Sequence, residues 1–433
     1  MKKTFTLLFV FLFTMMFQIK GQKDSTAALE KIPQYIPPPP KPGSSAYKSS
    51  AEPQFSCSEE YERVWELYKN KNYDKSLSLI DKVLKRCDLQ AAYYEMKGYI
   101  LIKMARTKEV IKTATEGLAI SPTDASLLDM RGSSYYFDFQ PEKALLDFRE
   151  MLKYDKGNAR YYNNYLKLLN EMRKDSEMIS VFNTFLIEKK KGVDFKDKRF
   201  LGEVYFYTSL AFQRQNDTKR GVELLDEALK LSPDGKSYLN NRGLFLQELG
   251  QSDKALTDFN KLIKIDPELA QSYIHRASVF QDLKQFDNSR KDYLKALALG
   301  TGANEVYAEL ANVYLKMNDY ENARRNFEIF LTKNVQNPSA YSNYAFALFD
   351  MNDQKKSLEN FEKAYALENN EIDTLVGLTV LYKLTGNDKR SEEIKKEIAA
   401  KTEYKADKKL LKTLEKSHYF YTDKFKTEWE NVF

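Results

Sequence analysis

The chain has 433 residues, of which 42% are hydrophobic, 13% aromatic and 30% charged, so it can both bury a large core and stay soluble. Its formal net charge is +6. Lys2, Lys3 and Lys20 supply three of the 68 basic groups, which leaves 65 basic against 62 acidic groups, or +3, for the rest of the chain. Such a balance forms no phosphate-binding stripe and argues against nucleic acid as a partner.

The amino terminus has the features of an export signal. Lys2 and Lys3 precede an apolar run from Phe5 to Phe17, which is short for a membrane span and is followed by Gly21. We expect a signal peptide over residues 1–21, with an uncleaved membrane anchor as the alternative. The protein is therefore expected to be exported, to the periplasm or, alternatively, to the cell surface or the medium.

A proline-rich linker is predicted over residues 22–56. Seven of the 12 prolines fall there, four of them in a row from Pro37 to Pro40. Proline lacks the backbone donor and favours an extended polyproline form, so the segment suits a semi-rigid spacer. A docking peptide for a proline-reading partner is the alternative.

Small and aromatic residues then recur every 34 residues. Gly243, Ala277, Ala311 and Ala345 share one offset, and the small residues Ala255, Ser289, Ala323 and Ser357 and the aromatic residues Phe259, Tyr293, Phe327 and Phe361 share two others. Small side chains at fixed offsets indicate the close crossing of a repeated helical hairpin, and the aromatic residue can fill the wedge to the next hairpin. The arithmetic gives six units over residues 202–405, with starts at Gly202, Lys236, Ala270, Asn304, Pro338 and Ile372.

A second register precedes these units. Gly98 and Gly132 are again 34 residues apart, which predicts four units over residues 57–192 with starts at Cys57, Ala91, Ala125 and Ala159. The next step would fall at Val193, so residues 193–201 are interpreted as an insertion, either a hinge or a lengthened helix.

This pattern of large, small and aromatic positions resembles the tetratricopeptide repeat (TPR) family over about residues 57–405. The resemblance implies an all-α fold in which about ten antiparallel helix pairs stack into a right-handed superhelical solenoid. Three units depart from the pattern, with Val64 and Leu166 at the small position and Lys395 at the aromatic position. Residues 406–433, rich in aromatic side chains, are predicted to form capping helices because a stack exposes an apolar end. An aromatic docking site is the alternative.

Cys57 and Cys87 are the only two cysteines, and both fall in the first unit. The start of the first helix lies beside the end of the second in an antiparallel hairpin, so we expect the two residues to form a disulfide in an oxidising compartment. Two unpaired thiols are the alternative.

The resemblance also implies a partner-binding groove on the concave face, formed by positions 2, 5, 6, 9, 12 and 13 of each unit. An aromatic part and an amide-rich part follow from these positions. The candidate residues are Tyr61, Trp65, Tyr68, Met96, Tyr99, Met130, Tyr136, Phe137, Asn163, Asn164, Phe206, Asn240, Asn241, Asn312 and Asn343, with Gln247 and Gln271 beside them. The same side chains could instead be ordinary packing or solvated helix residues.

No catalytic or metal site is predicted. The chain has only two histidines, His275 and His418, and lacks the motifs of metalloproteases, serine hydrolases and phosphate-binding loops. We therefore expect a non-enzymatic protein that binds other proteins or peptides, without a cofactor or a small-molecule substrate. It would contact a membrane only if its amino-terminal segment is not cleaved. Two roles remain open, a scaffold of the cell envelope and a carrier or assembly chaperone that shields apolar segments of exported clients.

Overall fold

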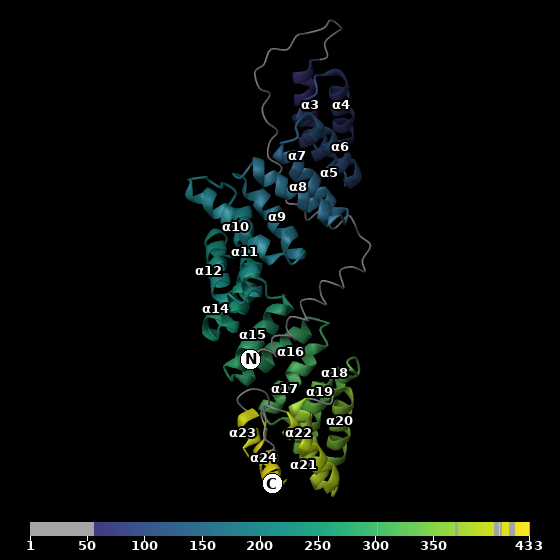
Figure 1. Ribbon diagram of the computed structural model, residues 1–433, viewed down its shortest axis with the longest axis vertical. Coiled ribbons are helices and arrows are strands. Elements are labelled where there is room, and N and C mark those ends of the chain that lie inside the picture. Colours follow the sequence, from purple (N-terminus) through teal and green to yellow (C-terminus); the bar gives the residue numbers. More distant parts are fainter. Residues whose placement is uncertain are drawn as a thin grey trace. The chain divides into compact units, whose positions relative to one another are not determined.

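The computed structural model describes residues 56–300, 302–368, 371–401, 407, 409–414 and 421–432, which form α-helices joined by short connections, with no strand in these ranges (Figure 1). The predicted signal peptide (1–21) and all but the last residue of the predicted linker (22–56) lie outside the described residues. The contacts between residues divide the chain into an amino-terminal unit that ends at Tyr238 and a carboxy-terminal unit that begins at Leu239.

In its described residues, from Ser56 onward, the amino-terminal unit consists of five helix pairs. Its helices are α3 (Cys57–Lys69), α4 (Tyr73–Arg86), α5 (Ala91–Lys103), α6 (Thr107–Ile120), α7 (Ala125–Phe137), α8 (Pro141–Tyr154), α9 (Ala159–Glu171), α10 (Asp175–Lys190), α11 (Lys198–Arg214) and α12 (Thr218–Leu231).

The part of the carboxy-terminal unit that the structure describes consists of five further pairs and two short helices after them. Its helices are α13 (Lys236–Glu248), whose first residues up to Tyr238 belong to the other unit, α14 (Ser252–Ile265), α15 (Ala270–Asp282), α16 (Phe286–Ala298), α17 (Glu305–Lys316), α18 (Tyr320–Leu331), α19 (Pro338–Asp350), α20 (Gln354–Leu367), α21 (Ile372–Leu384), α22 (Asp388–Ala400), α23 (Leu410–Leu414) and α24 (Asp423–Val432). The prediction of about ten helix pairs is confirmed.

Local sequence sets the ends of these helices. Asp124 and Asn337 accept hydrogen bonds from the backbone N–H groups of Leu127 and Ala340 at 2.9 and 2.8 Å, which satisfies donors that an α-helix leaves unpaired at its start. In most pairs the two helices are joined by three residues, the middle one with a positive φ. Glycine supplies this residue at Gly250 and Gly386, but Phe139 has a φ of 57°.

The small and aromatic positions pack as the 34-residue spacing predicts. A Cβ atom added to Gly243 would lie 2.7 Å from Cζ of Phe259 in the same pair, and one added to Gly377 would lie 2.2 Å from Cζ of Phe361 in the preceding pair. Each phenylalanine is fully buried. The ring therefore fills the wedge between one hairpin and the next, and a small residue opposite is a steric requirement.

An ion pair recurs within the hairpins. Arg131, Arg242 and Arg276, each at position 7 of its unit, form ion pairs with aspartates 16 residues later, Asp147, Asp258 and Asp292, at 2.6 to 2.7 Å. The aspartate side chains are nearly buried, so each pair ties a first helix to its second helix where water screens the charges little.

The insertion over 193–201 lengthens helices and buries one aromatic side chain. α10 has 16 residues and α11 has 17, and α11 begins at Lys198, before the expected start at Gly202, because Asp197 caps it. Between these helices Phe195 packs on Phe185 with 4.7 Å between ring centroids. The connection is thus anchored to the core of the amino-terminal unit.

The predicted cap is confirmed in the part of 406–433 that the structure describes. Tyr421, Phe425 and Trp429 are buried in one cluster with residues of α19, α21 and α22, and the indole N–H of Trp429 donates to the carbonyl of Asp407 at 3.1 Å. These aromatic side chains close the apolar end of the stack. His418 and the residues beside it lie outside the described ranges.

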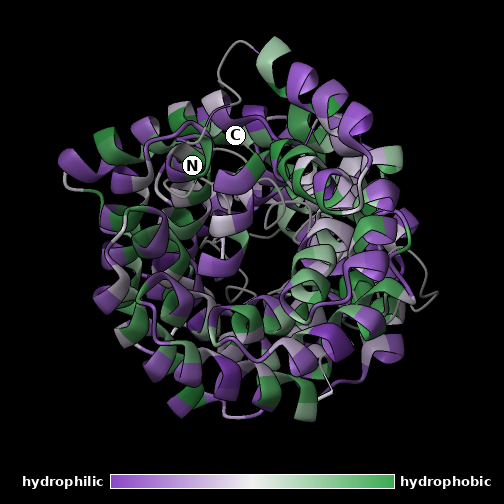
Figure 2. Ribbon diagram, turned by 90° about the horizontal axis from the view of Figure 1, so that it is seen from below, coloured by the Kyte–Doolittle hydropathy of each residue, from purple (hydrophilic) through white to green (hydrophobic). Residues whose placement is uncertain are grey.

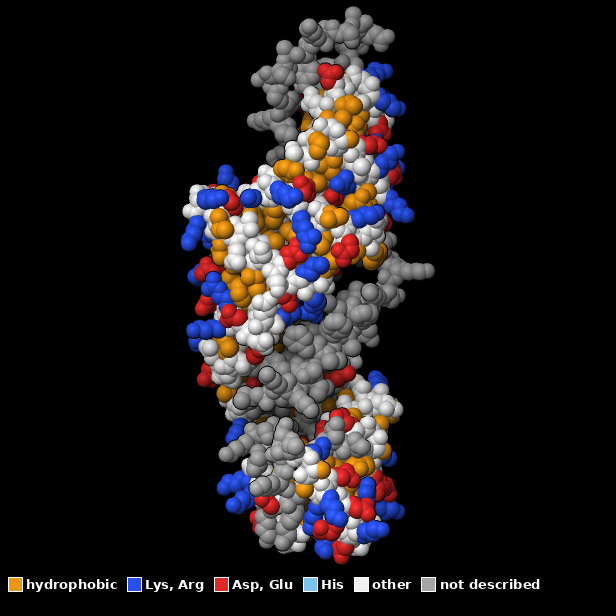
Figure 3. Space-filling model, viewed as in Figure 1, with side chains coloured by type: hydrophobic (Ala, Val, Ile, Leu, Met, Phe, Trp, Pro, Cys, Tyr) orange, Lys and Arg blue, Asp and Glu red, His pale blue; other side chains and the backbone are white. Residues whose placement is uncertain are grey.

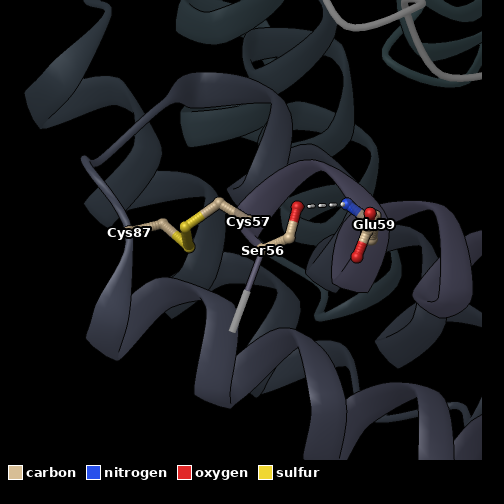
Figure 4. Close-up of a disulfide and its surroundings, with 4 residues drawn as sticks. All are labelled: Ser56, Cys57, Glu59 and Cys87. Carbon is tan, nitrogen blue, oxygen red and sulfur yellow. Dashed lines mark hydrogen bonds between the residues drawn. A yellow bond between two sulfur atoms is a disulfide. The ribbon is translucent and has the colours of Figure 1, made fainter. Parts of the chain in front are cut away.

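The predicted disulfide between Cys57 and Cys87 is present, with 5.9 Å between the two Cα atoms (Figure 4). It joins the start of α3 to the residue that ends α4, next to the N-cap residue Ser56, whose hydroxyl accepts from the backbone N–H of Glu59 at 3.4 Å. The bond closes the first hairpin at its open end.

Hydrophobic and hydrophilic residues occur on the same helices, as expected of helices with one packed side (Figure 2). Over the ranges that could be searched, no helix combines the length and the hydropathy that a bilayer span requires.

Candidate partner-binding face

The candidate site is the side of the first helices that carries positions 2, 5, 6, 9, 12 and 13, which we call the first-helix face. In the amino-terminal unit, side chains from successive first helices meet on this face. The hydroxyl of Tyr99, at position 9, lies 3.1 Å from that of Ser126, at position 2 of the next unit. Beside the face, the hydroxyl of Tyr238, at position 3, donates to Glu203, at position 2 of the preceding unit, at 2.7 Å. The resemblance-based positions therefore share one surface within this unit.

The predicted aromatic and methionine residues divide into a half-buried set and a packed set. Trp65, Tyr136, Phe137 and Phe206 are half-buried and can contact a ligand, whereas the other five, Tyr61, Tyr68, Met96, Tyr99 and Met130, are buried between helices.

The packed residues have structural partners. The rings of Tyr61 and Tyr93 are tilted by 54° with 5.1 Å between their centroids. Met130 packs on Gly98, where an added Cβ would lie 2.1 Å from the Met130 sulfur. Burial of this kind results from contact with the neighbouring helix, which the position number alone cannot reveal.

Trp65 belongs to the half-buried set and is held by two neighbours. It stacks on Tyr68 with 5.5 Å between centroids and 11° between planes, and the ammonium of Lys69 lies 5.6 Å from its centroid. Tyr136 in turn donates a hydrogen bond to Glu171 and carries Lys167 over its ring at 5.5 Å. Each ring is held in place by a neighbour, so little side-chain entropy remains to be lost when a ligand binds.

The predicted amides fall in both units. Asn163 and Asn164 lie on α9, and the amide N–H of Asn164 donates to Asp129 at 2.8 Å. In the carboxy-terminal unit Asn343 donates to Asn312 at 3.1 Å, whereas Asn240 and Asn241 lie together on α13.

Two further amides link neighbouring residues of the carboxy-terminal unit. Gln247 donates to Ser278 at 3.0 Å and to Asp282 at 2.6 Å, and Gln271 contacts the ring nitrogen of His275 at 3.1 Å. Whether the predicted set binds a partner stays a prediction.

Sequence reasoning missed a charged cluster on this face. Arg160 at position 2 of α9 pairs with Asp129 at position 5 of α7, with 3.2 Å between the charged groups. Burial raises the pKa of Asp129, and Arg160 and Asn164 oppose this shift. A buried aspartate inside the apolar run Leu127 to Met130 is the sequence signal that could have revealed it.

Glu95 on α5 belongs to the same cluster. Burial raises its pKa to about 7, the charge of Asp124 adds to this rise, and a hydrogen bond from Ser126 and the charge of Arg160 oppose it. Burial also raises the pKa of Glu203 further along the face. The face thus contains carboxyl groups that are poorly solvated.

The described residues contain no group of three or more His, Cys, Asp or Glu side chains suited to a metal ion. His275 lies 5.6 Å from the Phe259 ring centroid, and burial lowers its pKa to about 4, so its imidazole is neutral near pH 7.

Family models for the tetratricopeptide repeat match residues 208–270, 270–299 and 308–371. These matches show that the chain contains tetratricopeptide repeats, and the helix pairs described above have the arrangement of such repeats. No curated protein matches the chain.

Solved structures of the same kind of fold include three that share 16% to 19% identity. PilW, a type IV pilus biogenesis factor, has a TM-score of 0.45 over 49% of this chain and 98% of its own. Yeast Tom70 has a TM-score of 0.39 over 79% of this chain and 84% of its own. YrrB, a TPR protein with an unusual peptide-binding site, has a TM-score of 0.38 over 45% and 99%. At these identities the likeness concerns the fold alone.

Proposed function

We propose that the protein is a non-enzymatic scaffold of the cell envelope that binds peptide or protein segments on its first-helix face. The observation that carries this proposal is the alignment of half-buried rings on that face in the amino-terminal unit, with Trp65, Tyr136 and Phe206 each held by a neighbouring side chain. Rigid rings bury much apolar area at little entropic cost, which is typical of binding anchors.

Charge on the molecule supports a protein partner. Lys and Arg side chains are interspersed with Asp and Glu over the face drawn in Figure 3, without a broad area of one sign among the described side chains. Nucleic acid attracts a continuous basic surface, and a mixed surface offers it little.

Export is part of the proposal. The disulfide between Cys57 and Cys87 suits an oxidising compartment, and the apolar run after Lys2 and Lys3 suits a signal peptide. A periplasmic location is the one we propose, and fractionation of the cells that make the protein tests it. Recovery with the cytoplasmic fraction and free thiols would contradict it.

The second candidate role is a carrier for exported clients, which the aromatic character of the first-helix face favours. Mild crosslinking in isolated envelopes separates the two roles. A scaffold yields one stoichiometric partner, and a carrier yields many unfolded clients whose binding is insensitive to salt.

A pair of variants tests the face itself. We expect Trp65→Ala to weaken binding of the crosslinked partner, because it removes the half-buried ring that Lys69 and Tyr68 hold. Tyr154→Ala is the matched control, since Tyr154 is an exposed ring on the second helix α8. If both variants bind the crosslinked partner equally and keep their helix content, the first-helix face is not the binding site.

A further inference from the structure

The charged cluster of the amino-terminal unit contains three carboxyl groups and one guanidinium. The carboxyl of Glu95 lies within hydrogen-bonding reach of the carboxyl of Asp124 and of the hydroxyl of Ser126. Arg160 is already paired with Asp129 at 3.2 Å, and Asn164 donates to the same carboxylate at 2.8 Å. Asp129 is therefore compensated, whereas Glu95 and Asp124 face each other with no ion pair of their own in the described part of the chain.

Two polar atoms on α9 beside this cluster have no partner. Asn163 is only 5% exposed, its amide N–H donates to Asn164 at 3.1 Å, and its carbonyl oxygen accepts no hydrogen bond. The Nε–H of Arg160 donates none. Buried polar atoms are nearly always paired in folded proteins, so an unpaired acceptor and an unpaired donor on one helix indicate a ligand that supplies both.

These groups match the chemistry of an extended segment with a basic side chain. A peptide backbone offers an N–H and a carbonyl oxygen, which suit Asn163 and Arg160 respectively. A lysine or arginine side chain offers the cation that the two facing carboxyls need. When Glu95 is ionised, the net charge of the cluster is negative, since three carboxylates outnumber Arg160.

We propose that the amino-terminal unit binds an extended partner segment by a lysine or arginine side chain, with Glu95 and Asp124 holding the cation and Asn163 and Arg160 holding the backbone. This inference rests on the proposed function and names the chemistry of its partner. The rings of the first-helix face then contribute apolar contacts on either side of the charged position.

Binding is coupled to a proton. The groups that face Glu95 are Tyr61 of α3, Tyr99 of α5, Arg160 of α9, Ser126 of α7 and Asp124, the residue that caps α7. Burial beside Asp124 favours the protonated form of Glu95 in the free protein, and its pKa is about 7. A bound cation replaces that proton, so affinity rises with pH across this pKa.

Three pools of peptides of roughly nine residues test the inference, with lysine, glutamine or glutamate fixed at the central position and the other positions mixed. Binding of each labelled pool to the full chain is measured by fluorescence anisotropy at about pH 6 and about pH 8, which bracket the Glu95 pKa of about 7. We expect the lysine pool to bind about tenfold tighter than the glutamate pool at the higher pH, the size expected for one hydrogen bond to a charged group. That preference falls at the lower pH.

The variant Glu95→Gln should bring the three pools within about twofold of one another, since the facing carboxyl is lost. Glu116→Gln on the exposed side of α6 is the matched control and keeps the preference. The pH dependence of the unmodified chain needs no variant and keeps the test decisive if Glu95→Gln disturbs folding.

Equal binding of all three pools, no binding of any, or a lysine preference that is unchanged by pH overturns the inference. The proposed function is judged separately, on the crosslinked partner and its loss in Trp65→Ala. If partner binding is weakened by Trp65→Ala but is unchanged by Glu95→Gln, the proposed function is retained and the inference that a basic side chain is bound is rejected.

Discussion

Individual positions in this chain require glycine because an aromatic ring occupies the space that a side chain would need. Gly377 leaves no space for a side chain, because its added Cβ would lie 2.2 and 2.3 Å from two carbons of the Phe361 ring. Both residues are buried, and Phe361 belongs to the apolar cluster of the carboxy-terminal unit. The ring cannot turn aside without opening that core.

We predict that Gly377→Ala lowers the stability of the carboxy-terminal unit by about 1–3 kcal/mol through overpacking, even though alanine is the better helix former. Urea unfolding followed by circular dichroism measures the change. The double variant with Phe361→Leu should be destabilised by less than the sum of the two single variants, because leucine vacates the ring's position. A Gly377→Ala protein as stable as the unmodified one would show that the ring relaxes freely.

Glu95 gives the chain a pH dependence of known sign. Its pKa is raised from 4.5 to about 7 in the folded protein, so the folded state holds the proton more tightly than the unfolded state does. The stabilising contribution is complete below about pH 4.5 and is lost as the pH rises through about 7.

Glu95→Gln should therefore flatten the fall in melting temperature between about pH 5 and about pH 8, since glutamine stays neutral. Thermal unfolding at several pH values, beside the exposed control Glu116→Gln, measures this. A fall of the same steepness in Glu95→Gln and in the unmodified chain would refute the assignment.

At the scale of elements, the first hairpin depends on a covalent bond that the other hairpins lack. α3 and α4 have no preceding helix pair in the described residues, and the disulfide holds the start of one to the end of the other across 30 residues. Closing a loop of that length stabilises by roughly 3–4 kcal/mol on the chain-entropy estimate.

We expect replacement of both cysteines, Cys57→Ser with Cys87→Ser, to speed amide hydrogen exchange in α3 and α4 and to leave α15 and α16 unchanged. Exchange measured by mass spectrometry on peptides from each pair gives the result. Because a repeat stack is stabilised by nearest neighbours, loosening should fade within the next pair or two. Equal exchange with and without the cysteines would mean that packing alone holds the first hairpin.

At the scale of the whole molecule, the end of the array must be covered. Trp429 of α24 is fully buried, and the same cluster contains Phe346 and Phe349 of α19 together with much of α21. α24 thereby covers the apolar side of the last helix pair, as a following pair covers that side of every other pair.

We predict that Trp429→Ala destabilises the carboxy-terminal unit by about 3–5 kcal/mol and promotes self-association through the uncovered apolar end. Thermal unfolding and light scattering after size-exclusion chromatography measure the two effects. Glu430→Ala, which changes the exposed neighbour, should do neither. If the Trp429→Ala protein is monomeric and as stable as the unmodified chain, other residues form the cap.

Much of the fold could be predicted from the sequence, because repetition makes steric requirements visible. Small residues at one offset and rings at another predict the hairpin starts, and α5, α7, α9 and α15 begin at the expected Ala91, Ala125, Ala159 and Ala270. The disulfide and the aromatic cap follow from the same reasoning, since an end hairpin lacks a neighbour on one side. The right-handed coiling that the resemblance implies stays a prediction.

The candidate site was less accessible to sequence reasoning. Positions along a helix indicate which face a side chain occupies, which predicts Trp65 and Tyr136 on an available surface. Tyr99 shares position 9 with Trp65, and Met130 is at position 6 of the same face, yet both are buried. What separates the two sets is the distance to the next helix, which depends on packing between pairs. The same holds for Glu95, Asp124 and Arg160, which come from three helices and meet only when those helices stack.

The sequence by itself therefore determined the period, the helix pairs and the closure of both ends, because these depend on side-chain size at fixed spacing. Only the tertiary structure decided which side chains remain open to a partner and which carboxyls lack a cation. Burial and charge compensation are properties of neighbours in space, and neighbours from different repeats are 27 to 35 residues apart in the chain.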